Sequence, residues 1–272
     1  MILWKFSAIF FALILIIGGI VWGLSSPALR ITRIEVTGNS FLGTDEITSF
    51  VRKEISGKYF FLFPKDSIAL YPKERIKKDL LDSFKRILSI KVTPQGLTAL
   101  SISINERKPY SLWCGEALGD TGAPVDTPCY FTDETGFLFA EAPHFGGNAY
   151  VEFYGPLYEA GNATSPPSTI PVGSIFLPIS EFKTINLFRD LLERIGLKIR
   201  AITALDAGDV TFSIREGGKI LFNKKQDPMK LVSDIESAFR TELGDPKDPL
   251  TRKQIDYIDA RFANKIFFKK KP

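Results

Sequence analysis

The chain has 272 residues, of which 44% are hydrophobic and 12% aromatic, and its formal net charge is +4. This apolar content is enough for one or two cores of ordinary domain size, which excludes a simple stalk. The small positive charge gives no reason to expect a nucleic-acid partner. Part of it comes from Lys269, Lys270 and Lys271. Residues 270–272 therefore form a basic tail, either solvated or in contact with anionic lipid or wall polymer.

The amino-terminal segment is unusually apolar, because residues 6–29 contain no Asp, Glu, Lys or Arg. Residues 6–24 would form about 28 Å of helix, close to the thickness of a bilayer core. Trp4 and Trp22 flank this stretch, as aromatic residues do at membrane interfaces. We expect an uncleaved transmembrane signal anchor at 6–26 after a cytoplasmic stub at 1–5. The alternative is a cleaved signal peptide, but the apolar run is long for one and Pro27 would obstruct cleavage.

Basic residues near the apolar segment do not decide its orientation. Lys5 precedes it, and Arg30 and Arg33 follow it. Since nearly the whole chain follows the segment, we expect the amino terminus in the cytoplasm and the body outside it. The sequence thus predicts a single-pass protein of the cytoplasmic (inner) membrane.

The pattern of residues 31–108 predicts a small α+β domain. Residues 31–36 alternate like a half-buried strand, and Thr44 caps a helix that ends before Gly57. The aromatic segment 59–63 is expected to be a buried connector. A second helix at 72–84 and two strands at 87–92 and 97–106 complete a β-α-α-β-β order.

Two cysteines, Cys114 and Cys129, stand at the ends of strand-like stretches. Outside the cytoplasm they could form a disulfide that closes the loop between them, and a loop of this length would add about 3 kcal/mol. The alternative is a pair of free buried thiols. A zinc site is disfavoured because His144 is the only histidine.

The pattern of residues 109–269 predicts a β-rich α+β domain with an antiparallel sheet. Its polar turns separate several short strands, and two amphipathic helices begin near Ser180 and Pro228. The final strands lie between Ile255 and Lys269.

Four short motifs occur along the chain in the same order as in a known protein family. They are Val36-Thr37-Gly38-Asn39, Thr44-Asp45-Glu46-Ile47, Glu106-Arg107-Lys108-Pro109 and Ile258-Asp259-Ala260-Arg261-Phe262. Together they resemble the FtsQ/DivIB family of bacterial cell-division proteins, in which a POTRA domain is followed by a β domain. The stretches 115–128 and 155–180 depart from the family pattern.

This resemblance implies a partner-binding site at the last strands. In the family, the terminal strand binds FtsB/DivIC, which is itself paired with FtsL. The matching positions are Arg261 as a charge partner, Phe262 as an apolar anchor and Asn264 as a backbone-side contact. From strand alternation we extend the site to Ile266 and Phe268. The competing interpretation is that Phe262, Ile266 and Phe268 simply belong to the core.

No catalytic pattern stands out in the sequence. His144 has no neighbouring catalytic partner, and no nucleophile elbow or phosphate-binding glycine loop occurs. We therefore expect no enzyme activity, cofactor, metal or small-molecule substrate. The resemblance implies a bitopic scaffold of the divisome, located at the septum, with FtsB/DivIC-like, FtsL-like and other divisome membrane proteins as partners. The alternative is a POTRA-bearing export or envelope-assembly component that binds exported chains by β-augmentation.

Overall fold

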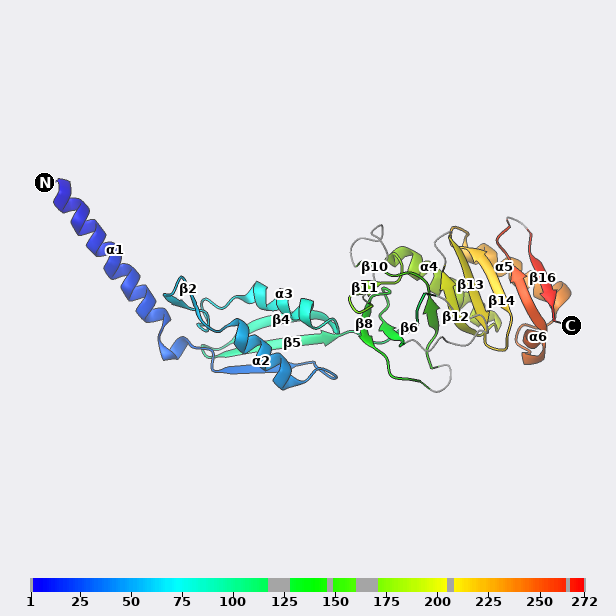
Figure 1. Ribbon diagram of the computed structural model, residues 1–272, viewed down its shortest axis with the longest axis horizontal. Coiled ribbons are helices and arrows are strands. Elements are labelled where there is room, and N and C mark those ends of the chain that lie inside the picture. Colours follow the sequence, from blue (N-terminus) through cyan, green and yellow to red (C-terminus); the bar gives the residue numbers. More distant parts are fainter. Residues whose placement is uncertain are drawn as a thin grey trace. The chain divides into compact units, whose positions relative to one another are not determined.

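The computed structural model describes residues 2–116, 128–145, 149–159, 171–204, 208–262 and 265–271, without the side chains of residues 2–8 (Figure 1). The fold class is α+β with a mostly β-sheet body. Residue contacts divide the chain into two compact units, Met1–Arg107 and Lys108–Pro272. The sequence placed this boundary after residue 108.

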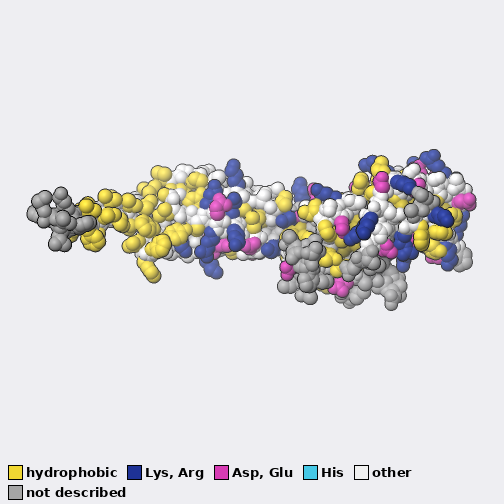
Figure 2. Space-filling view, turned by 90° about the horizontal axis from the view of Figure 1, so that it is seen from above, with side chains coloured by type: hydrophobic (Ala, Val, Ile, Leu, Met, Phe, Trp, Pro, Cys, Tyr) yellow, Lys and Arg dark blue, Asp and Glu magenta, His cyan; other side chains and the backbone are white. Residues whose placement is uncertain are grey.

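The first helix, α1 (Ile2–Leu24), occupies the predicted anchor. Its described side chains begin at residue 9, and residues 9–24 give about 24 Å of helix, against ~30 Å for a bilayer core. Among the described residues no helix is both long and apolar enough to span a bilayer. This finding corrects the predicted transmembrane anchor at 6–26 and the predicted single-pass location in the cytoplasmic membrane. Figure 2 shows hydrophobic side chains gathered at the amino-terminal end, where those of α1 are largely exposed.

The first unit is built around a three-stranded sheet in the order β1-β5-β4. β1 runs parallel to β5, and β4 runs antiparallel to it. Its elements are η1 (Pro27–Leu29), β1 (Arg33–Thr37), α2 (Thr44–Glu54), β2 (Lys58–Tyr59), β3 (Phe63–Pro64), α3 (Lys73–Ser83), β4 (Ile87–Gln95) and β5 (Ala99–Glu106). The predicted β-α-α-β-β order is present, with the short β2–β3 hairpin inserted between the helices.

The core of the first unit lies between the two helices and the sheet. Ile47 and Val51 of α2 are four residues apart and fully buried, as are Ile76 and Leu80 of α3. Residues at this spacing share one face of a helix, so each helix turns an apolar stripe toward the strands. They pack with Ile102 and its neighbours on the sheet in one hydrophobic cluster.

The prediction that the aromatic connector at 59–63 is buried is wrong. Phe60 and Phe61 form the turn of the β2–β3 hairpin and are 86% and 94% exposed. The hairpin pairs Lys58 with Pro64 and Tyr59 with Phe63, which directs the turn away from the core.

The second unit contains a nine-stranded sheet in the order β16-β15-β14-β13-β12-β9-β6-β7-β8. Its strands are β6 (Ser111–Trp113), β7 (Tyr130–Thr132), β8 (Leu138–Glu141), β9 (Glu152–Tyr154), β12 (Ile199–Ala204), β13 (Asp209–Ile214), β14 (Lys219–Asn223), β15 (Ile255–Asp259) and β16 (Phe267–Lys270). The short strands β10 (Tyr158–Glu159) and β11 (Ser174–Ile175) pair separately. The helices are α4 (Ile179–Ile195), α5 (Pro228–Ala238), the π-helical η2 (Phe239–Leu243) and α6 (Pro249–Gln254).

The predicted antiparallel sheet is in fact mixed. β9 runs parallel to both β6 and β12, and β14 runs parallel to β15. A parallel pair requires a crossover connection, and α5, η2 and α6 provide one between β14 and β15.

Hydrophobic cores lie on both faces of the large sheet. On one face, α4 and α5 pack over the strands, and Phe153, Phe188 and Phe212 are among the buried residues there. On the other face, a smaller cluster beside the β6–β9 end includes Phe131, Phe139 and Tyr154. Phe153 and Tyr154 are neighbours in β9, so strand alternation sends one to each core.

Candidate partner-binding edge of the second unit

The last two strands form a hairpin at one end of the nine-stranded sheet. β15 and β16 are antiparallel, with Ile258 opposite Phe268 and Asp259 opposite Phe267. Within the described ranges, β15 is the only strand that pairs with β16. The outer side of β16 is therefore an edge at which another strand could be added.

The backbone hydrogen bonds show which groups this edge presents. The N–H of Lys271 donates to the C=O of Gln254 at 2.7 Å, which directs Lys271 toward the β15 side. Because backbone groups alternate along a strand, those of Phe267 and Lys269 also point toward β15, and those of Phe268 and Lys270 point outward. An added strand would find donors and acceptors at Phe268 and Lys270.

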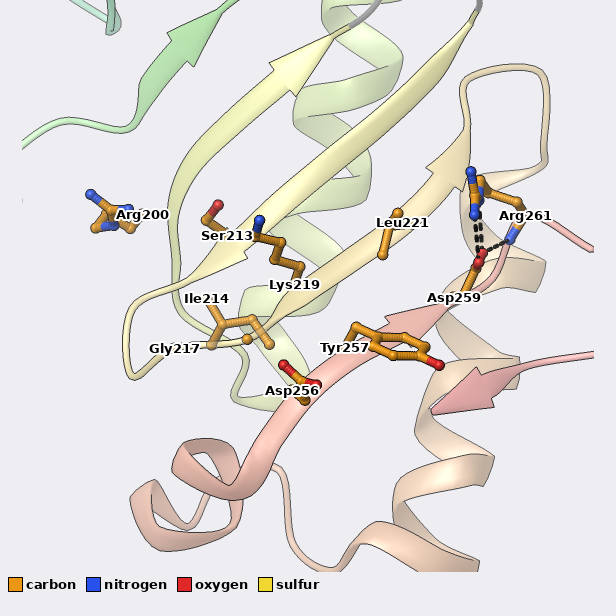
Figure 3. A pocket seen from close by; sticks show the side chains of 11 residues that line it. Arg200, Ser213, Ile214, Gly217, Lys219, Leu221, Asp256, Tyr257, Asp259 and Arg261 are labelled. Atoms are coloured by element: carbon orange, nitrogen blue, oxygen red, sulfur yellow. Dashed lines mark hydrogen bonds and ion pairs between the residues drawn. The ribbon is translucent and has the colours of Figure 1, made fainter. Parts of the chain in front are cut away.

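Arg261, the predicted charge partner, is already held by two carboxylates. Its Nε and Nη2 donate to Asp259 Oδ1 and Oδ2 at 2.9 and 2.7 Å, and its Nη1 donates to Asp209 Oδ2 at 3.1 Å. The hydrogen bond from Arg261 lowers the pKa of Asp259 despite partial burial, which acts in the opposite direction. Arg261 thus ties the end of β15 to the start of β13, and Figure 3 shows its ion pair with Asp259.

The other predicted contacts fall into two groups. Phe262 is 52% exposed, and its ring lies edge-on to that of Phe267, with the two ring centroids 5.4 Å apart. Ile266 and Phe268 are half-buried and pack against the larger core of the second unit. Asn264 lies outside the described residues. The apolar anchor is therefore accessible, whereas the two residues added from alternation mainly face inward.

The structure adds exposed residues that the sequence interpretation missed. Phe267 is 50% exposed and Tyr257 is 37% exposed. The register places Phe267 opposite Asp259 and Lys269 opposite Tyr257, on the face that carries no helix. Alternation could have identified Phe267 only if Phe268 were known to be in the core. Two adjacent phenylalanines leave that choice open.

Two hollows lie beside this hairpin. A hollow of about 600 Å³ lies over the helix-free face of β13, β14 and β15, and it is lined by cationic side chains, Arg200 and Lys219, and by the carboxylates Asp256 and Asp259 (Figure 3). A smaller one of about 160 Å³ lies between α5 and the β15–β16 turn, and Phe262 and Ile266 contribute to its wall. Both are open depressions with side chains of both charges, suited to contact with a partner's side chains.

The predicted disulfide is present in the structure. Cys114 follows β6 and Cys129 precedes β7, and the two are bonded to each other. Neither therefore offers a free thiol. Across the described parts of the chain, no group of three or more His, Cys, Asp or Glu side chains is arranged to hold a metal ion.

The fold and the site together define an α+β protein of two units, the second of which carries a large mixed sheet with an open edge strand. Comparison with protein-family models finds no match, and comparison with curated proteins finds none. The resemblance to the FtsQ/DivIB family accordingly rests on the sequence motifs.

Proposed function

We propose that this chain is a non-enzymatic scaffold of bacterial cell division that binds an FtsB/DivIC-like protein, paired with an FtsL-like protein, by strand addition to β16. The observation that carries the proposal is the open edge of β16, with the backbone groups of Phe268 and Lys270 directed outward. The family resemblance supplies the identity of the partners.

Side chains around the edge support selectivity for one partner strand. Phe262 and Phe267 provide an exposed aromatic pair beside the backbone groups. Lys265, Lys269, Lys270 and Lys271 are all exposed. Their charge favours an acidic partner strand and also discourages pairing between two copies of this edge.

The test removes one outward N–H and leaves the fold intact. Proline at position 270 lacks the N–H that an added strand would use, and edge strands tolerate proline where the N–H faces solvent. We expect Lys270→Pro in the full chain to weaken binding to the purified FtsB/DivIC-like and FtsL-like pair about tenfold, the effect of ~1.4 kcal/mol. The dissociation constant is measured by biolayer interferometry.

Lys270→Ala is the matched control. It removes the side chain, whose Nζ donates to the Glu242 carbonyl at 3.0 Å, and keeps the backbone N–H. Binding should survive this change, and thermal unfolding should show that both variants are folded. Equal affinities of the two variants would contradict strand addition at β16. Equal binding to unfolded exported chains would support the export alternative.

A further inference from the structure

The turn of the β2–β3 hairpin exposes the most accessible large apolar side chains of the described chain. Phe61 and Phe60 are 94% and 86% exposed, and Leu62 beside them is 50% exposed. Phe41 of the same unit is 76% exposed, but it has a cationic partner in the Arg86 guanidinium, 4.7 Å from its ring centroid. The cluster Phe60-Phe61-Leu62, here called the aromatic tip, projects its side chains into solvent.

The backbone of the aromatic tip is strained. Leu62 N–H donates to the Tyr59 carbonyl at 3.0 Å, and the two residues between them have φ values of 48° and 64°. Phe60 and Phe61 are the only residues other than glycine with positive φ in the described part of the chain. Turns of this kind favour Asn-Gly, because bulky side chains are disfavoured in the left-handed region. Two exposed phenylalanines here oppose folding stability, which points to a role in binding.

Cationic side chains surround the base of the hairpin. Lys58 and Lys65 flank it, and Lys65 Nζ lies 5.4 Å from the centroid of the Tyr59 ring. A hollow of about 380 Å³ next to β2 and β3 is lined by Arg30, Arg52 and Lys58. One carboxylate, Asp66, also lines it and forms an ion pair with Arg30 at 3.5 Å. The hollow therefore carries a net positive charge.

We propose that the aromatic tip inserts into an anionic lipid surface, with lipid headgroups held by the cationic hollow. The tip is a convex apolar point with cations behind it, which matches the order of apolar chains and anionic headgroups in a lipid leaflet. Aromatic rings and the long aliphatic side chains of lysine both favour the boundary between lipid headgroups and acyl chains. The site belongs to the first unit and does not depend on the proposed function of β16.

The experiment uses the full chain and places a fluorescent label on the β2–β3 hairpin, so that the signal reports on the hairpin alone. Because the two native cysteines are bonded to each other, Leu62→Cys introduces the only free thiol for an environment-sensitive fluorophore. On addition of vesicles with equal parts of phosphatidylglycerol and phosphatidylcholine, we expect a blue shift, a severalfold rise in emission and quenching by acyl-chain nitroxide lipids. The same label at Leu97→Cys, in the β4–β5 turn and 61% exposed in the native chain, should not respond.

Two further variants separate binding from folding. With the label at position 62, Phe60→Asn combined with Phe61→Gly should abolish the emission shift and leave the unfolding midpoint equal or higher, because it supplies the favoured turn residues. Lys58→Gln should weaken the response to anionic vesicles about fivefold, the equivalent of one cation near such a surface.

The proposal is overturned if the label at position 62 stays unchanged on vesicles. It is also overturned if the Asn-Gly variant keeps the shift, or if only a protein partner and not lipid produces it.

Discussion

At the end of β5, the carboxylate of Glu106 accepts hydrogen bonds from three consecutive backbone N–H groups. Ser40, Phe41 and Leu42 donate to its Oε1 at 2.7, 3.1 and 3.1 Å. Close by, Gly38 has a φ of 80°, and a Cβ there would lie 2.1 Å from the Ile104 carbonyl oxygen. Glu106, from one motif of the family resemblance, therefore holds the loop that follows another motif, Val36-Thr37-Gly38-Asn39, between β1 and α2.

Removing the Glu106 carboxylate should destabilise the first unit. Glu106→Ala leaves three N–H groups of a part-buried loop without their acceptor, and we expect the free energy of unfolding to fall by about 2 kcal/mol or more. Urea denaturation followed by circular dichroism measures this change.

Glu35→Ala is the matched control for Glu106→Ala. Glu35 pairs with Arg33 on the surface, and its side chain is 38% exposed. Its removal should change stability by less than ~1 kcal/mol. If the two substitutions had equal effects, the carboxylate of Glu106 would not be what holds the loop.

Among the elements, β6 and β7 are joined both by hydrogen bonds and by a covalent link. Trp113 lies opposite Tyr130, and the next residue on each strand's outer end is a cysteine of the disulfide. The indole N–H of Trp113 donates to the Gly155 carbonyl at 2.9 Å, which connects this strand pair to the end of β9. The disulfide therefore links the adjacent ends of β6 and β7 next to the buried indole ring of Trp113.

Loss of the disulfide should cost the second unit stability and leave its fold in place. The bonded cysteines are 15 residues apart. A closed loop of this size adds about 3 kcal/mol on the chain-entropy model. We expect the double substitution Cys114→Ser, Cys129→Ser to lower the free energy of unfolding by that amount in urea titrations. Dithiothreitol should reproduce the loss in the native chain and have no effect on the variant. A native chain insensitive to the reductant would argue against this contribution.

At the scale of the whole molecule, each compact unit has buried clusters made only of its own residues. The first has one core between its helices and sheet, and the second has one on each face of its large sheet. Since each unit buries its own apolar surface, each has the material to fold cooperatively by itself.

Two separate unfolding transitions should therefore appear in scanning calorimetry of the full chain. Leu80→Ala, at a fully buried site of the first unit, should lower one transition, with a loss of about 2–5 kcal/mol. Phe212→Leu, in the core of the second unit, should lower only the other. A single transition, or a shift of both by either substitution, would show that the units unfold together.

The local pattern of the sequence was enough to predict the two main helices and the three sheet strands of the first unit, and the pairing of Cys114 with Cys129. Helix and strand periodicity depend on near neighbours, as in the spacing of Ile47 and Val51, so they can be recognised without knowledge of the fold.

Contacts between distant residues were decided by the tertiary structure. Asp209, the second partner of Arg261, lies 52 positions away, and no local pattern indicates it. The parallel pairing of β14 with β15 depends on how three helical segments cross the sheet. Because Phe267 and Phe268 are both apolar, alternation could not show which one faces the core. The segment around Phe60 looked buried from its composition, but its hairpin register turns it into solvent. Local chemistry sets the elements, and long-range packing decides which of their side chains a partner can reach.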